Sequence, residues 1–108
     1  MARVINTVVN PKYTPVNVSS SGDSELVAAV PGKRLKLISG LAVSAGTVSI
    51  KFKSASTDLT GAMPLIANSG FVIPEATAGW IVTAQGEALN LNLSAAIQVS
   101  GMLVYEEE

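Results

Sequence analysis

Hydrophobic and polar residues alternate with a period of two along much of the chain. The clearest case is the stretch Gly86–Leu93, which ends in Leu89, Asn90, Leu91, Asn92 and Leu93. A period of two places all three leucines on one face of an extended strand and both asparagines on the other, whereas a helix would scatter the leucines around its circumference. The stretch therefore predicts a half-buried β-strand, and we expect the other strands to pack around it.

The run that follows repeats this pattern. Within residues 95–105, one parity is occupied by Ile97, Val99, Leu103 and Tyr105. Only residues 94–96 separate the two runs, so they are expected to pair as an antiparallel hairpin.

A second hairpin is predicted nearer the middle of the chain. Residues 33–45 carry Leu35, Leu37, Leu41 and Val43 on one parity, and residues 47–53 carry Val48, Ile50 and Phe52. The break at Ala45-Gly46 suggests a turn, in which Val43 faces Val48 and Leu41 faces Ile50.

Shorter alternating runs are expected to form strands at 16–19, 25–30, 62–66, 71–74 and 80–84. Turn or loop residues separate them, and no segment has a helical period. About eight strands with turn signals every 8–12 residues are typical of an all-β, antiparallel β-sandwich, here jelly-roll-like. We assign residues 16–108 to this single domain.

Residues 1–15 are set apart from that domain by their prolines. An apolar run at 3–9 is followed closely by Pro11 and Pro15. Proline inside such a run favours an edge strand or an extended arm. Two interpretations stay open: an N-terminal arm laid over the domain or over a neighbouring molecule, and an ordinary first strand.

Composition adds a hint that another molecule covers part of the surface. Of the 108 residues, 14% are charged, against roughly 25% in a typical soluble domain. A sparsely charged surface on a small protein favours contact with a partner. The net charge of −1 gives no support for nucleic-acid binding. No stretch is long and apolar enough to span a membrane, and the first residues lack a signal-peptide pattern, so we expect synthesis in the cytoplasm.

The chain contains no cysteine and no histidine, which removes the usual nucleophiles, bases and metal ligands. Asp23 and Glu25 are two residues apart on one side of a predicted strand, an arrangement that a glycosidase can use. A turn-capping aspartate beside a solvated glutamate is the commoner role. The loop 54–60 offers only Asp58 to a calcium ion. We therefore predict no enzyme, no catalytic residue, no metal and no cofactor.

Three groups of residues are candidates for an interface. In the second predicted hairpin, one outer face would carry Arg34, Lys36, Lys51 and Lys53, with no acid on either strand. The chain ends in Glu106, Glu107 and Glu108. The basic face is expected to meet this tail across a subunit contact or to meet an acidic patch of a partner, although a solvated face is equally common. Trp80 is either a core or interface anchor or a stacking platform for a sugar or base.

Several segments resemble a small β protein that recurs in tailed bacteriophages. They are Gly32-Lys33-Arg34, Val48–Ser54, Asp58–Ala62, Gly86–Leu93, Val99-Ser100-Gly101 and Tyr105, so that the likeness covers about residues 26–105. Proteins of this type are virion structural proteins that decorate or cement the capsid.

The resemblance implies a homotrimer on the capsid surface, bound to the shell of major capsid protein, and no catalytic residues. The alternative is a head-fibre or tail-fibre domain that recognises a host-surface carbohydrate through Trp80 and the asparagines.

Overall fold

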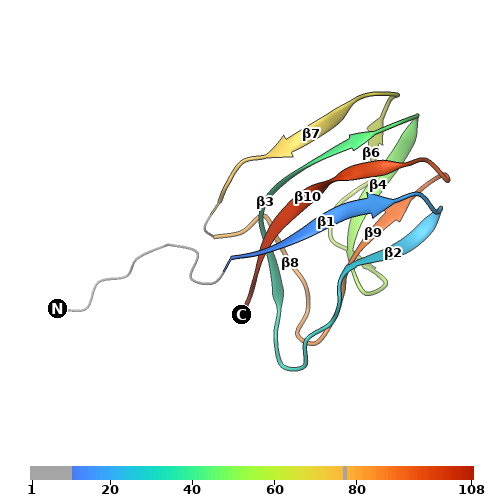
Figure 1. Ribbon diagram of the computed structural model, residues 1–108. Coiled ribbons are helices and arrows are strands. Elements are labelled where there is room, and N and C mark those ends of the chain that lie inside the picture. Colours follow the sequence, from blue (N-terminus) through green and yellow to red (C-terminus); the bar gives the residue numbers. More distant parts are fainter. Residues whose placement is uncertain (1–10, 77) are drawn as a thin grey trace.

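The protein is a sandwich of two antiparallel β-sheets (Figure 1). The computed structural model describes residues 11–76 and 78–108. Sheet A has the order β1-β10-β3-β7, with β8 also beside β3; sheet B has the order β2-β9-β4-β5, with β6 also beside β4. The strands are β1 (Lys12–Val18), β2 (Gly22–Val27), β3 (Leu35–Ser44), β4 (Val48–Ser54), β5 (Thr57–Asp58), β6 (Met63–Leu65), β7 (Gly70–Ile73), β8 (Ile81–Val82), β9 (Leu89–Leu93) and β10 (Val99–Glu107).

The strands wrap around the core as in a jelly roll. Strands β1, β3, β7 and β10 lie in sheet A, and β2, β4, β6 and β9 lie in sheet B, so the chain repeatedly crosses from one sheet to the other. The two remaining strands, β5 and β8, have two residues each. The eight longer strands therefore give two sheets of four, and the predicted jelly-roll-like sandwich is confirmed.

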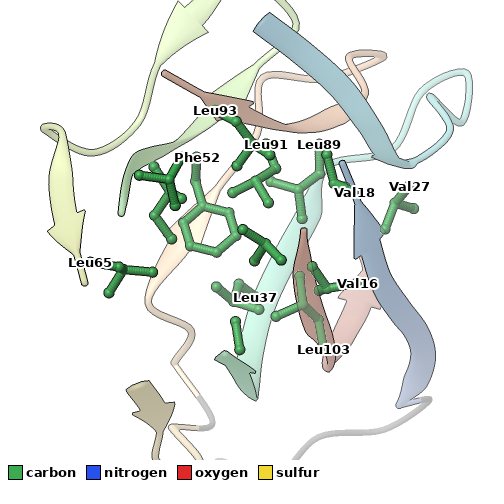
Figure 2. Close-up of a cluster of buried hydrophobic side chains, with 14 of the residues drawn as sticks. Val16, Val18, Val27, Leu37, Phe52, Leu65, Leu89, Leu91, Leu93 and Leu103 are labelled. Carbon is green, nitrogen blue, oxygen red and sulfur yellow. The ribbon is translucent and has the colours of Figure 1, made fainter. Parts of the chain in front are cut away.

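The core lies between the sheets (Figure 2). Leu89, Leu91 and Leu93 project into it from sheet B and are almost fully buried, as their alternation predicted. From sheet A, Val99 and Leu103 of β10 meet them. Aliphatic side chains supply most of this core. Among the buried residues that the structure describes, Phe52 is the one aromatic residue.

Both predicted hairpins are wrong. Strand β9 pairs with β2 and β4, whereas β10 pairs with β1 and β3, so these consecutive strands lie in different sheets. Strands β3 and β4 are separated in the same way. Alternation shows which face of a strand is buried. That face is buried whether the next strand along the chain pairs with it in the same sheet or lies across the core in the other sheet. The short links 45–47 and 94–98 cross between the sheets instead of turning within one.

A bulge in β3 overturns the predicted parity of that strand. Leu37 pairs with Tyr105 and Ser39 pairs with Val104, which leaves Ile38 without an opposing residue. An extra residue of this kind exchanges the two faces of the strand beyond it. Leu35 and Leu37 therefore point into the core, while Leu41 and Val43 point outward.

Among the described residues, strand β1 occupies an edge of sheet A, where it pairs only with β10. It begins at Lys12 and contains Pro15, so the boundary predicted after residue 15 falls inside it. Proline is accommodated because an edge strand has one side without a hydrogen-bonded neighbour. The predicted arm at residues 1–10 lies outside the described residues.

Buried hydroxyl groups fix the loops at one end of the sandwich. The Oγ1 of Thr83 accepts a hydrogen bond of 2.9 Å from the backbone N–H of Leu35. The Oγ of Ser54 donates to Glu87 Oε1 at 2.6 Å and accepts from the N–H of Ala84 at 2.9 Å. These bonds hold the segment between β8 and β9 against both sheets.

Candidate interaction surface

The outer face of sheet B is polar where β2, β9, β4 and β5 lie side by side. Directly opposed residues share a face of an antiparallel sheet, and the register places Asp23, Asn92 and Lys51 in one row and Glu25, Asn90 and Lys53 in the next. Asp58 of β5 extends the second row. We call these seven residues the sheet-B face.

Ion pairs neutralise the lysines of the sheet-B face. The Nζ of Lys53 lies 3.3 Å from Asp23 Oδ2, and the Nζ of Lys51 lies 3.2 Å from Asp58 Oδ2. Asn92 donates a 2.7 Å hydrogen bond to the other oxygen of Asp23. This hydrogen bond, together with the neighbouring ammonium of Lys53, holds the pKa of Asp23 below its usual value.

The predicted basic face does not exist as one surface. Lys51 and Lys53 belong to sheet B, but Lys36 lies on β3 of sheet A and Arg34 precedes that strand. The acids that the predicted hairpin lacked come instead from β2 and β5, which lie on either side of β9 and β4 in sheet B. The interpretation failed because it paired β3 with β4.

The acidic tail already has a cationic partner in its own chain. The Nζ of Lys36 lies 3.3 Å from Glu106 Oε1 and 3.2 Å from Glu108 Oε2, and its side chain is 13% exposed. Burial lowers the pKa of Lys36, but hydrogen bonds to Glu108 and Glu106 outweigh it and raise the pKa above its ordinary value. The backbone of Glu108 also pairs with that of Arg34 in both directions, at 2.7 and 2.9 Å.

Glu107 lies beside these paired residues and lines a shallow recess with Pro11, Lys12 and Lys33. Burial raises the pKa of Tyr105, and the negative charge of Glu107 raises it further. The end of the chain is thus built into sheet A, where Lys36 takes up two of the three tail carboxylates.

The outer face of sheet A is apolar at its centre. One row crosses four strands and consists of Pro15, Met102, Leu41 and Val72. The adjacent rows add Tyr13 with Val104 on one side and Val43 on the other. We call these seven residues the sheet-A face. The exposed fractions are 67% for Tyr13, 42% for Leu41, 49% for Val43 and 75% for Val72.

Polar groups border the sheet-A face at both ends. Asn17 and Ser100 lie in the row of Val43, where Gln98 Nε2 donates to both of them at 2.8 and 3.0 Å. At the other end lies the ion pair of Lys36 with Glu106. An apolar centre with a polar rim is the anatomy of a protein–protein interface.

The size of the sheet-A face can be compared with known interfaces. Four strands about 4.8 Å apart and three rows about 7 Å apart span about 400 Å². The largest apolar patch on a typical monomer covers about 300–600 Å² and is often functional, and the area of the sheet-A face falls within that range. It is about half of what one partner contributes to a standard interface, about 800 Å².

Trp80 stands at an apolar hollow between the two sheets. The hollow has a volume of about 300 Å³ and is lined by Leu37, Phe52, Thr60, Met63, Phe71, Val72, Ile73, Trp80 and Ile81. The indole is 53% exposed, and its Nε1 donates a 2.7 Å hydrogen bond to the carbonyl of Pro74. Because Val72 belongs to both, the hollow adjoins the sheet-A face at β7.

The carboxylates considered for hydrolysis lie on the sheet-B face. Asp23 is engaged by Lys53 and Asn92, and Glu25 is opposite Asn90 on the same strand pair. Within residues 11–76 and 78–108, no three acidic side chains are grouped so as to hold a metal ion. The same residues form no helix that could cross a membrane.

Sequence reasoning missed the sheet-A face because it assigned Leu41 and Val43 to the core. One signal was present: Met102 and Val104 have the opposite parity to the predicted core residues of their strand. Apolar residues on both parities of β10 indicate a strand with both faces covered.

Comparison with protein-family models, with curated proteins and with solved structures finds no match to this chain.

Proposed function

We propose that this protein is a non-enzymatic structural protein of a bacteriophage virion, a capsid decoration or cement protein that attaches to the shell of major capsid protein. The observation that carries the proposal is the contrast between the two outer faces of the sandwich. The sheet-B face pairs both of its lysines with aspartates, whereas the sheet-A face presents seven uncharged residues from four strands. The resemblance of residues 26–105 to phage decoration proteins agrees with it.

Attachment through the sheet-A face has an energetic consequence. Burying about 400 Å² of apolar surface contributes roughly 10 kcal/mol at about 25 cal/mol per Å². Association itself costs on the order of 4–15 kcal/mol in lost freedom of motion. One copy therefore binds the shell weakly, and linked copies, such as the expected homotrimer, gain from binding together. Such contacts exist only in the assembled shell, which they stabilise against the pressure of packaged DNA.

The test is attachment of purified protein to shells that lack it. We expect Leu41→Lys to reduce occupancy at least about tenfold, because it places a charge in the centre of the apolar row. The double variant Lys51→Gln, Lys53→Gln changes a similar number of surface atoms on the opposite face and should attach normally. Equal attachment of Leu41→Lys and wild type would contradict docking through the sheet-A face.

A second measurement addresses the role in the virion. Phage particles lacking the protein should assemble but lose infectivity more readily on heating or osmotic shock. Particles of equal robustness with and without the protein would contradict a cementing role.

Carbohydrate recognition by a fibre domain is the alternative, and Trp80 is its candidate platform. The hollow beside Trp80 is lined by eight apolar residues and Thr60, whereas a sugar site needs several polar groups that converge on the ligand. A glycan array separates the two functions, because a cement protein requires no sugar. Specific binding that is lost in Trp80→Ala would favour the fibre domain.

A further inference from the structure

Among the described residues, the two edges of sheet A carry different apolar features. At one edge, β1 carries Tyr13, which is 67% exposed. At the opposite edge, β7 and β8 each pair only with β3 within the described part of the chain, and the apolar hollow opens beside them. Figure 1 shows β1 and β7 at the two sides of the layer formed by sheet A. A projecting aromatic side chain and an apolar hollow are therefore presented by one chain in different directions.

The hollow is suited to an apolar body and offers little to a polar ligand. The hydroxyl of Thr60 donates to the carbonyl of Gly61 at 3.0 Å and accepts from the N–H of Phe52 at 3.1 Å. The indole N–H of Trp80 is bonded to Pro74. With these polar groups already paired, binding comes from apolar contact. A tyrosine matches such a site because its ring can be buried while its hydroxyl stays at the rim.

The charges beside the two features are also complementary. Lys12 precedes Tyr13 in β1 and lines the same recess as Glu107, and Glu75 follows Pro74, whose carbonyl anchors Trp80. Both side chains are exposed, and neither has an ion-pair partner among residues 11–76 and 78–108. This contrasts with Lys36, Lys51 and Lys53, all of which are paired within the chain.

We infer that copies of this protein associate edge to edge, with Tyr13 of one copy seated in the hollow beside Trp80 of the next and Lys12 facing Glu75. The inference rests on the self-association that is part of the proposed function, and it identifies the surfaces involved. A contact between two different surfaces forms a ring if the rotation between copies closes and a filament if it does not, and the expected homotrimer is a ring of three.

The occupant is a second copy because both halves of the contact are on this chain and, apart from Tyr13 and Val72, the sheet-A face stays free between them. A two-fold dimer made by opposing two sheet-A faces would cover the surface that the proposed function leaves for the shell. Edge-to-edge association instead joins neighbouring sheet-A faces into one apolar platform, larger than the face of a single copy, for the shell.

Sedimentation velocity over a range of concentrations tests the contact. We expect Tyr13→Ser to raise the dissociation constant of self-association at least about tenfold, as for an interface anchor. The matched control is Ile66→Ser, which removes another exposed apolar side chain, 69% exposed, outside both features. Melting temperatures within a few degrees of wild type establish that each variant folds. A wild type that is monomeric throughout, or association unchanged by Tyr13→Ser, would overturn the inference.

Charge reversal gives an independent test. Lys12→Glu and Glu75→Lys should each weaken association, and the two changes combined in one chain should restore it. Because the contact is exposed, each effect is small, about twofold to fivefold, and decreases with salt. Failure of the double variant to recover would exclude the pairing of Lys12 with Glu75.

The absence of native cysteine allows a direct test of proximity. A chain with Tyr13→Cys, mixed with a chain with Val72→Cys and oxidised mildly, should form mixed disulfide dimers. The control mixture pairs Tyr13→Cys with Ile66→Cys. Equal yields in both mixtures would contradict the inference. If Tyr13→Ser loses association but Leu41→Lys still attaches to shells like wild type, the edge contact stands and docking through the sheet-A face fails.

Discussion

At the scale of residues, most of the candidate interface side chains are occupied within the chain itself. Lys53 bridges Asp23 and Asp58, at 3.3 and 3.8 Å, and Lys36 bridges two tail glutamates. An exposed ion pair, such as that of Lys51 with Asp58, contributes only about 0–1 kcal/mol to stability. The main consequence of these ion pairs is therefore that the lysines carry little unpaired charge for a partner.

The lowered pKa of Asp23 predicts a dependence of stability on acid pH. Its pKa in the folded state lies below the unfolded value of 3.8, so its contribution is present above that value and lost as the pH falls through the folded pKa. Asp23→Asn should therefore lose less stability than wild type between pH 5 and about pH 2. Urea midpoints at several pH values measure this. Glu25→Gln, on the same face, is the matched control, and an identical pH profile for Asp23→Asn and wild type would contradict the prediction.

Thr83 permits a sharper test of a single hydrogen bond. Thr83→Val keeps the shape of this fully buried residue but removes the acceptor for the N–H of Leu35. An unsatisfied buried donor costs about 1–3 kcal/mol, which should appear as a lower urea midpoint. Thr83→Ser retains the oxygen and should lose less. A valine variant as stable as wild type would show that the N–H finds another acceptor.

At the scale of elements, the central strands of sheet A depend on close backbone approach. A Cβ at Gly40 would lie 2.6 Å from Leu103 Cδ2 and 2.7 Å from the carbonyl oxygen of Met102. A Cβ at Gly101 would overlap the backbone of Leu41 and Ala42. Glycine is required at these positions because β10 and β3 have no room for a larger residue on that side.

Gly101→Ala should therefore destabilise the fold by about 1–3 kcal/mol, since the added methyl group meets rigid backbone. Chemical denaturation measures the change. Gly61→Ala is the control, because nothing lies within 4 Å of a Cβ there. A Gly101→Ala variant with the same free energy of unfolding as wild type would show that β10 and β3 move apart easily.

At the scale of the molecule, the two sheets present chemically different outer faces, and this determines how attachment should respond to salt. Contacts made by the apolar sheet-A face are not screened by ions, and sulfate strengthens apolar burial. Occupancy on shells should therefore persist or increase as sodium sulfate is raised. Attachment that falls steeply with salt would point to charged residues instead of the sheet-A face. Lys51→Gln with Lys53→Gln should leave occupancy unchanged at every salt concentration.

The sequence by itself determined the class of fold and much of the core. Alternation identified Leu89, Leu91 and Leu93 as buried and placed Asn90 and Asn92 on the opposite face, because the side-chain period of a strand is a local property. Turn residues located most of the strands for the same reason. The number of strands and the spacing of turns indicated a sandwich of two sheets, although the pairing of the strands did not follow from them.

Only the tertiary structure decided which strands are neighbours and hence which surfaces exist. Alternation leaves the same face buried whether β9 and β10 lie edge to edge or across the core. The bulge at Ile38 depends on its partner strand, and it turned Leu41 and Val43 from predicted core residues into the centre of the sheet-A face. Lys36 and Lys53 found acids on strands far away in sequence. Pairing between distant segments is a property of the whole chain, which is why the ion pairs, the sheet-A face and the hollow appeared only in the folded structure.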